Sequence, residues 1–546
     1  MKKRSSPQVN FWLLLGVLTS CFATLSFKTI AQTAPVIQWD KTFGGSGFDE
    51  LYSIQQTADG GYILGGSSDS GLSGDKSQSL QGTSDIWIVK LDANGNKIWD
   101  KTFGGNDYDI LGSLQITADG GYLIAGTSDS DISGDKSQPS QGYVDYWIIK
   151  LDASGNKLWD KVYGGNTIDV LTSALQTADG GYILSGFSDS NVSGDKTHPS
   201  RGRTDYWIVK LDLNGNKLWD RTFGGTELDD SPKIKQTADG GYILGGNSTS
   251  PVSGDKSENT QGAEPDYWVL KLDNAGNKIW DRTFGGGDED LLYSIQQTSD
   301  GSYLLGGSSK SGVSGNKVQP LKGSRDYWLI KLNNTGTRIW EKSYGGLNNN
   351  FCSSIQQTAD GGYILGGWSD FGIGGDKTQM GRGNADFWII KLDTSGTKLW
   401  DKAIGGSDID NLLALQQTSD GGYILGGISN SQAGFDKTSQ SKGLSDYWVV
   451  KLGAEITGFN EAELTLPIAI FPNPNAGKFN LQLSRLTSST AEVSITDLLG
   501  RTVLHKEFKF SDNQLLEEIS IPYTKGMYLL HVKTGNRTAT RKISVE

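Results

Sequence analysis

Residues 85–105 read DIWIVKLDANGNKIWDKTFGG, and two landmarks of this stretch each occur seven times in the 546-residue chain. One landmark is the Asp-x-Trp step, and the other is a pair of glycines after an aromatic or apolar residue. The glycine pairs follow Phe43, Phe103, Tyr163, Phe223, Phe284, Tyr344 and Ile404, so neighbouring pairs lie 60 or 61 residues apart. A fixed period of this kind indicates a repeated supersecondary unit.

Each unit contains four runs with the pattern of β-strands. In the first unit these runs cover residues 51–57, 62–67, 85–91 and 97–103. The connecting segments carry Asp, Asn and Gly, which form tight turns readily. Successive side chains of the third run are apolar on both faces, so each sheet needs cover on both sides. The sequence predicts an all-β fold: a seven-bladed β-propeller followed by a small C-terminal β-sandwich.

The two ends of the repeat region are complementary. Residues 36–43 match a fourth strand, whereas the seventh unit stops at Leu452 after its third. We expect the N-terminal strand to complete the last blade, because this pairing leaves no unfinished sheet edge.

The N-terminus has the features of an export signal. Residues 1–4 are basic and precede a short apolar run, so residues 1–31 are assigned to a signal peptide that ends before Gln32. An alternative is lipoprotein processing at Cys21, because residues 18–21 resemble a lipobox.

The remaining chain divides into three segments. The propeller is predicted for residues 32–452, a linker for 453–467 and a C-terminal module for 468–546. After signal removal, no later segment is apolar enough for a transmembrane helix.

Composition excludes several classes of function. The chain has 62 acidic and 50 basic residues, and its formal net charge of −12 argues against nucleic acid as a partner. Two cysteines and three histidines provide neither a disulfide framework nor a cysteine zinc site. We expect an exported monomer without a cofactor, with calcium as the one open exception.

The long loop between the second and third strands of each unit is the expected carrier of binding, because rigid scaffolds present function on such loops. Trp368 stands where other units have Ser67 or Ser308. Together with Asp370 and Phe371 it forms the predicted ligand-binding site, since aromatic rings can stack on sugars.

Carboxylates recur on the same predicted face. Asp288 and Asp290 belong to the predicted ligand-binding residues as well, and they are the candidate acid/base pair if the protein is a glycosidase. The oxygen-rich loop with Asp129, Asp131 and Asp135 is the candidate calcium site. The alternative is that these aspartates cap turns by accepting backbone N–H bonds, because their positions recur around the ring.

Two further residues have the chemistry for catalysis. His198 is the only histidine of the repeats, and we expect it to be a solvated loop residue rather than part of a Ser-His-Asp site. Cys352 replaces Tyr52 of the first unit and is expected in or near the core.

The C-terminal module has its own motifs: Pro472-Asn473-Pro474 with Gly477, Asp497 with Gly500 and Arg501, Gly526 with Tyr528, and residues 541–545. In these residues the module resembles the type A C-terminal sorting domain of proteins exported by the Bacteroidetes type IX secretion system. The resemblance implies contact with the secretion machinery, followed by release or attachment at the cell surface. The propeller units are similar to repeats of uncharacterised secreted propellers, which implies no activity.

Three functions are compatible with the sequence. The first is a non-catalytic module that binds a glycan or a protein, and the near-identical units without a localised catalytic cluster favour it. The second is an extracellular carbohydrate-active enzyme, either a glycosidase or a lyase, because a fold does not decide function. The third is a structural surface protein.

Overall fold

The computed structural model describes residues 33–455, 468–484, 490–498, 500–510, 514–522, 524–534 and 537–546. These residues form strands, turns and bends, and none of them is helical, so the predicted all-β class is confirmed. Within this described part there is no helix with the length and apolar character needed to cross a bilayer. The predicted signal peptide with Cys21, and residues 456–467 of the predicted linker, lie outside the described residues.

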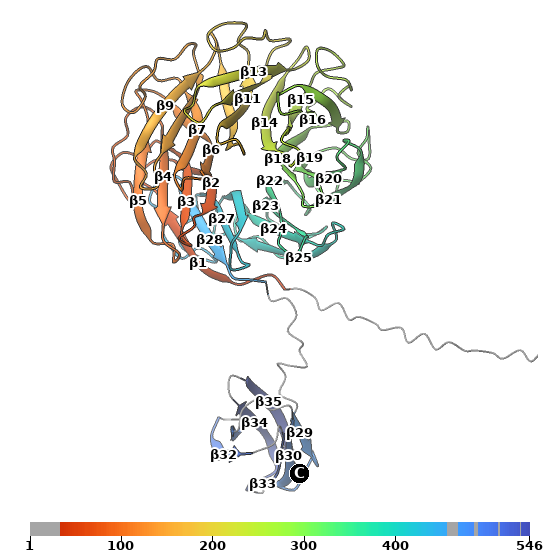
Figure 1. The fold of residues 1–546 in the computed structure, drawn as a ribbon. Helices are drawn as coiled ribbons and strands as arrows, with labels where there is room; N and C mark the ends of the chain where they lie inside the picture. Colours follow the sequence, from red (N-terminus) through yellow and green to blue (C-terminus); the bar gives the residue numbers. More distant parts are fainter. Residues whose placement is uncertain are drawn as a thin grey trace, which may run out of the picture. The chain divides into compact units, whose positions relative to one another are not determined.

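Seven four-stranded antiparallel sheets follow one another along the chain (Figure 1), an arrangement consistent with propeller blades. The first strand of each sheet is the innermost. These strands are β2 (Asp49–Gln56), β6 (Asp109–Ile116), β10 (Asp169–Gln176), β14 (Asp229–Gln236), β18 (Asp290–Gln297), β22 (Asn350–Gln357) and β26 (Asp410–Gln417). Each contacts the next, and β26 contacts β2, so the inner strands form a ring, the centre of which we call the central channel.

The other strands follow in order toward the rim. The second strands are β3 (Tyr62–Ser68), β7 (Tyr122–Ser128), β11 (Tyr182–Ser188), β15 (Tyr242–Ser248), β19 (Tyr303–Ser309), β23 (Tyr363–Asp370) and β27 (Tyr423–Ser429). The third strands are β4 (Asp85–Leu91), β8 (Asp145–Leu151), β12 (Asp205–Leu211), β16 (Asp266–Leu272), β20 (Asp326–Leu332), β24 (Ala385–Leu392) and β28 (Asp446–Leu452). The outermost strands of the first six sheets are β5 (Lys97–Phe103), β9 (Lys157–Tyr163), β13 (Lys217–Phe223), β17 (Lys278–Phe284), β21 (Arg338–Tyr344) and β25 (Lys398–Ile404).

The seventh sheet combines the two ends of the repeat region. Its outermost strand is β1 (Ile37–Phe43), which pairs antiparallel with β28 and places Thr42 opposite Trp448. Trp448 Nε1 donates to Asp40 Oδ2 at 3.0 Å, and within the first sheet Trp87 Nε1 donates to Asp100 Oδ2 at 3.1 Å. The junction between the two ends therefore has the same contacts as the interior of a single sheet.

The core lies between neighbouring sheets. The tryptophans of the Asp-x-Trp steps are fully buried, as Trp87 illustrates, and Tyr447 of the seventh sheet donates its hydroxyl to the Trp87 carbonyl at 3.0 Å. A buried indole removes about 200 Å² from water, or about 5 kcal/mol before the entropic cost of ordering it. A second, half-buried set packs edge-on against the next sheet, as Trp39 does on Tyr62.

The C-terminal module consists of two sheets with a shared core. One sheet contains β29 (Ile468–Phe471), β30 (Lys478–Ser484) and β33 (Gln514–Ser520), and the other contains β31 (Thr490–Asp497), β32 (Thr502–Lys509), β34 (Gly526–Thr534) and β35 (Arg537–Val545). Side chains that include Phe479, Leu481, Val493 and Leu530 form the core between them.

Candidate binding site on the loop face

The two ends of each inner strand differ in their surroundings. β2 begins at Asp49, beside the glycine pair and the long loop 69–84, and ends at Gln56, beside the tight turn 57–61. We call the end that carries the long loops the loop face and the opposite end the turn face. The predicted site residues of the repeats all belong to the loop face.

The recurring aspartate of the inner strand caps the segment after the glycine pair. Asp290 is fully buried and accepts hydrogen bonds from Gly286 N at 2.7 Å and Ser311 Oγ at 2.9 Å. Burial raises its pKa, although these hydrogen bonds oppose the shift. Asp288 is exposed and donates its backbone N–H to Ser311 Oγ. The two residues of the predicted acid/base pair therefore lie in unlike environments.

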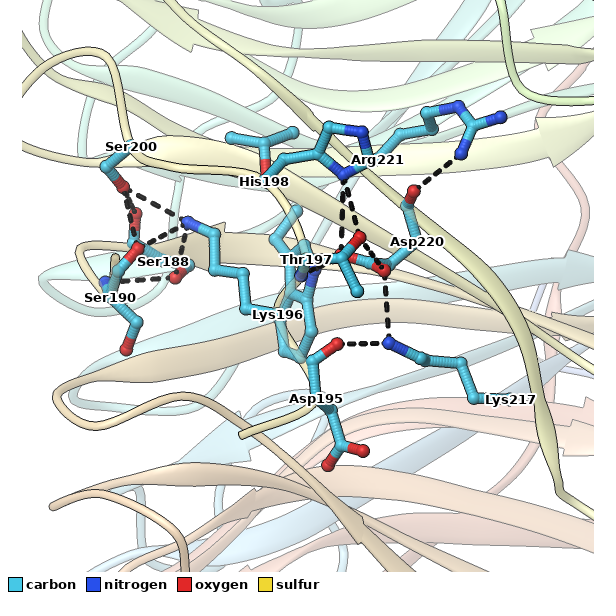
Figure 2. A network of polar contacts seen from close by, with 12 residues as sticks. Ser188, Ser190, Asp195, Lys196, Thr197, His198, Ser200, Lys217, Asp220 and Arg221 are labelled. Atoms are coloured by element: carbon cyan, nitrogen blue, oxygen red, sulfur yellow. Dashed lines mark hydrogen bonds and ion pairs between the residues drawn. The ribbon is translucent and has the colours of Figure 1, made fainter. Parts of the chain in front are cut away.

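The recurring aspartates of the inner strands lie near buried lysines, and Lys196 near Asp169 is one example. Figure 2 shows Lys196, whose Nζ donates to Ser188 Oγ at 3.0 Å, to the Ser190 carbonyl at 2.7 Å and to Ser200 Oγ at 3.1 Å. Burial lowers the Lys196 pKa, while the charges of Asp169 and Asp205 oppose that shift. This lysine is the last residue of the Ser-Gly-Asp-Lys motif and its variants, so the motif builds the interior in each unit.

His198 lies at the edge of the same network (Figure 2). Its Nδ1 is 3.0 Å from Thr197 Oγ1 and 3.8 Å from Asp220 Oδ2. Asp220 already accepts hydrogen bonds from Thr197, Trp207 and Lys217. The serines drawn in Figure 2 contact Lys196 rather than the imidazole, so they do not complete a Ser-His-Asp arrangement.

The predicted calcium residues lie around a lysine of the same kind. Lys136 donates to Ser140 Oγ at 2.6 Å, and its charge interacts with those of Asp129 and Asp131. Asp135 Oδ2 accepts Gln81 Nε2 at 2.6 Å. Among the residues the structure describes, no group of three or more His, Cys, Asp or Glu side chains has a metal-binding arrangement. Calcium binding stays a prediction. A calcium ion at this place would compete with the Lys136 ammonium group for the same carboxylates.

Trp368 is partly covered by another aromatic ring. It lies opposite Phe351 on the adjacent strand, with ring centroids 4.0 Å apart and planes 21° apart. Arg325 covers the Phe351 ring at 4.3 Å from its centroid and pairs with Glu289. The structure thus brings Trp368 into a stack that sequence analysis did not predict.

The two residues predicted alongside Trp368 have different roles. Asp370 Oδ2 accepts Asn349 Nδ2 at 3.0 Å, so its carboxylate is held by the neighbouring segment. Phe371 is 52% exposed. Of the predicted set, Phe371 presents the most open aromatic surface.

A cavity of about 220 Å³ lies on the loop face between the first and second sheets. Phe48 and Tyr108 line it, and they are 47% and 50% exposed. Glu50 and Asp69 line it as well, together with Ile110, Ser67, Thr83 and Ser84. This cavity combines open aromatic rings with polar groups, and it was missed by the sequence analysis.

One equivalent position of the seven aligned units contains the sequence signal for this cavity. The residue before the inner-strand aspartate is Phe48, Tyr108, Ile168, Leu228, Glu289, Asn349 or Ile409. Only the first two units have an aromatic residue there, and these units are neighbours. Comparing this position among the units would have shown an aromatic pair across one interface.

Cys352 lies in the core, as expected. It is fully buried among apolar side chains that include Ile355 and Trp388. Burial raises the pKa of its thiol above the usual range, which disfavours the reactive thiolate.

The predicted sorting residues form turns and core contacts of the C-terminal module. Asn473, between Pro472 and Pro474, bonds to the last strand: its Nδ2 donates to Lys542 O at 3.0 Å and its Oδ1 accepts Ser544 N at 2.8 Å. Tyr528 is buried and donates its hydroxyl to Thr524 O at 2.9 Å. The opening of the motif is therefore held against the last strand of the same module.

The glycines of this motif serve its turns. Gly477 and Gly500 have φ values of +87° and +81°, which favour glycine. Gly526 begins β34. Asp497 and Arg501 close the turn around Gly500, with Arg501 Nε 2.7 Å from Asp497 Oδ2. The motif thus specifies the shape of the module.

The other proteins to which the chain is similar are distant from it in sequence. Regulatory protein FlaEY of Caulobacter vibrioides is 23% identical over 294 residues, which are 49% of this chain and 30% of that protein. The chain thus spans less than a third of this relative. The crystal structure of puromycin hydrolase is similar with 12% identity, coverage of 83% of this chain and 62% of that one, and a TM-score of 0.40. A mutant apocarotenoid oxygenase of Synechocystis has 12% identity, coverage of 78% and 95%, and a TM-score of 0.32.

The C-terminal module has a specific match. Residues 469–546 match the family model described as the secretion system C-terminal sorting domain. This domain implies interaction with the type IX secretion machinery. The protein is therefore a secreted cargo, exported by type IX secretion to the cell surface or the extracellular space.

Proposed function

We propose that residues 32–452 form a secreted seven-bladed β-propeller that binds a glycan, without catalysis, in the cavity between its first and second sheets. In this proposal residues 1–31 are the signal peptide, 453–467 a linker and 468–546 the sorting domain. The observation that carries the proposal is that the half-exposed rings of Phe48 and Tyr108 line one cavity together with polar side chains.

The chemistry of this cavity suits a sugar. The apolar faces of sugar rings pack on aromatic side chains, while hydroxyls bond to carboxylates and serine or threonine hydroxyls. Glu50 and Asp69 supply the carboxylates at this cavity. The loop face of other units carries residues that serve as secondary contacts for a longer oligosaccharide. These residues are Trp368, Asp370, Phe371 and Asp288.

The hydrogen bonds of the two carboxylates favour binding over hydrolysis. Glu50 accepts the Tyr52 hydroxyl, and Asp69 accepts the Phe48 backbone N–H. A glycosidase needs one carboxyl group as the acid and a second as the base or nucleophile. Both carboxylates here are held by protein donors, which suits a fixed acceptor for sugar hydroxyls.

A protein partner is a second candidate, favoured by a different observation. The long loops carry an exposed apolar side chain in six successive units. These residues are Leu72, Ile132, Val192, Val252, Val313 and Ile373. Exposed apolar groups that recur on one face are typical of interaction surfaces.

The test uses the chain 32–546 and a panel of polysaccharides and oligosaccharides, with retention and released products measured together. We expect retention without new products, and a loss of at least roughly tenfold in affinity for Tyr108→Ala. Tyr143→Ala is the matched control, because Tyr143 is 75% exposed but lies outside the cavity. New oligosaccharides would instead indicate an enzyme, and retention only on a protein partner would favour the second candidate.

A further inference from the structure

A second cavity, of about 280 Å³, lies in the central channel near the turn face. Inner strands of five sheets contribute to its wall, including the side chains of Gln55, Lys235, Gln296, Gln356 and Gln416. In the described structure its lining contains one cation, Lys235, and no carboxylate. This composition is unusual for a chain whose net charge is −12.

Gln55 Nε2 donates to the Leu114 carbonyl at 3.0 Å, whereas the other three glutamines have amide nitrogens available to this cavity. Gln356 Oε1 accepts Gln417 N at 2.6 Å, and Gln416 Oε1 accepts Gln56 N at 2.7 Å. Since the neighbouring sheet holds each oxygen, the Nε2 groups are left for the channel. Gln296 Nε2 is buried and has no hydrogen-bond partner among the described residues. Leaving such a donor without an acceptor costs about 1–3 kcal/mol.

Lys233 adds a second positive charge on the same strand face, because residues two apart in a strand point the same way. Its Nζ donates to the Thr172 carbonyl at 2.7 Å. Burial, and then the charge of Lys235, lowers the Lys233 pKa to about 8. Lys235 itself is exposed and lines the cavity in the channel.

No carboxylate is among the groups that shift the Lys233 pKa. In contrast, Lys271 of the same sheet pairs with Asp239 at 2.9 Å. Two neighbouring cations without such a partner favour a bound anion, because an opposite charge offsets the desolvation of Lys233 and the repulsion between the two ammonium groups.

We propose that the central channel binds a small oxyanion, held by the Lys235 ammonium group and the side-chain amides of Gln296, Gln356 and Gln416. The ligand carries a phosphate, sulfate or carboxylate group, either as a free inorganic ion or as part of a small organic acid. This site is separate from the proposed glycan cavity, because it lies at the other end of the inner strands.

The repeat itself provides the test variant. The position of Lys235 is occupied by Gln55, Gln115, Gln296, Gln356 and Gln416 in five other units and by Leu175 in one. Lys235→Gln therefore restores the residue of the majority and is expected to fold. Lys161→Gln, on the outermost strand β9, removes the same charge far from the channel and is the matched control.

The experiment is a calorimetric titration of the chain 32–546 with phosphate, sulfate and acetate in chloride buffer. We expect at least one of the three to bind the wild type, Lys235→Gln to weaken binding by roughly tenfold or more, and Lys161→Gln to leave it unchanged. Binding of phosphate or sulfate would identify an inorganic oxyanion site, and preference for acetate a carboxylate site. The proposal is overturned if none of the three binds, or if Lys235→Gln binds as tightly as the wild type.

Discussion

The inner strands β14 and β18 occupy equivalent places in the fourth and fifth sheets but differ at the channel. Both begin with a buried aspartate, Asp229 or Asp290, and both end with glutamine. β18 leaves one residue unpaired, between Leu292 and Ser294. β14 leaves two residues unpaired, between Asp230 and Lys233, and Ser231 there has a φ of 54°. The strand with the widest irregularity is the one that carries the two channel lysines.

This difference separates the residues that stabilise the fold from the candidate binding residues. Residues that face the adjacent sheets are retained, as Ile234 and Ile295 are at the equivalent position of the two strands. Residues that face the channel change, from Ser294 and Gln296 to Lys233 and Lys235. Recurring groups should therefore govern stability, and departures from the repeat should govern binding.

The largest expected effect is on a recurring core residue. Trp87→Ala removes a fully buried indole and its hydrogen bond to Asp100, so the free energy of unfolding should fall by about 3–5 kcal/mol. Chemical denaturation of the chain 32–546 measures this. A loss below about 1 kcal/mol would contradict the role assigned to the recurring tryptophans.

The buried carboxyl groups predict a pH dependence. Burial raises the pKa of Asp85 and Asp145 to about 6 and that of Asp266 to about 7. The folded chain therefore binds more protons than the unfolded chain between about pH 4 and pH 7, and stability falls as pH rises through this window. We expect Tm to drop by roughly 5 °C from pH 5 to pH 7.5.

Asp266→Asn is the variant that sharpens this prediction. Its Tm should depend less steeply on pH, because the group with the highest pKa of the three no longer titrates. Above about pH 8 the trend reverses, because Lys256, whose pKa burial lowers to about 8, loses its proton in the folded chain before it does in the unfolded chain. A Tm that rises from pH 5 to pH 7.5 would contradict the assignment.

A non-recurring tryptophan should matter less than a recurring one. Trp368→Ser restores the residue type of Ser67 and removes one stack with Phe351 from a half-buried position. The expected loss in the free energy of unfolding is about 1–2 kcal/mol, measured by the same denaturation. A loss equal to that of Trp87→Ala would remove the distinction between the two kinds of tryptophan.

The smallest expected effect is a gain in stability. Lys233→Ser restores the residue type of Ser294 and removes a cation that folding desolvates, at the cost of its hydrogen bond to Thr172. The net gain in chloride buffer at pH 7 should be about 1 kcal/mol. Because the folded pKa is about 8 and the unfolded value 10.5, this gain is complete below pH 8 and disappears by about pH 10.5. A loss of stability at pH 7 would show that Lys233 is compensated by a group of the protein.

Much of the fold follows from local pattern. The 60-residue period, the turn residues and the late start of the first unit predicted seven sets of four strands, and the structure contains seven such sheets. The C-terminal motif could also be identified from the sequence, because its prolines, glycines and Asp497 form local turns. These features depend on residues close together in the sequence.

The candidate sites depend on residues from different sheets. Phe48 and Tyr108 lie in separate units and meet only because neighbouring sheets pack together. The channel cavity requires five inner strands that are spread from Ile54 to Gln416. Trp368 could be identified as an isolated tryptophan, but its partner Phe351 could not be assigned without the pairing of β22 and β23. Column-by-column comparison of the units supplies part of this information.

The most direct test of the proposed function is a crystal structure of the chain 32–546 soaked with a retained oligosaccharide. The account predicts a sugar ring between Phe48 and Tyr108, with its hydroxyls bonded to Glu50 or Asp69. Sugar density confined to the turn face or to the outermost strands, with the Phe48 and Tyr108 cavity empty, would contradict it.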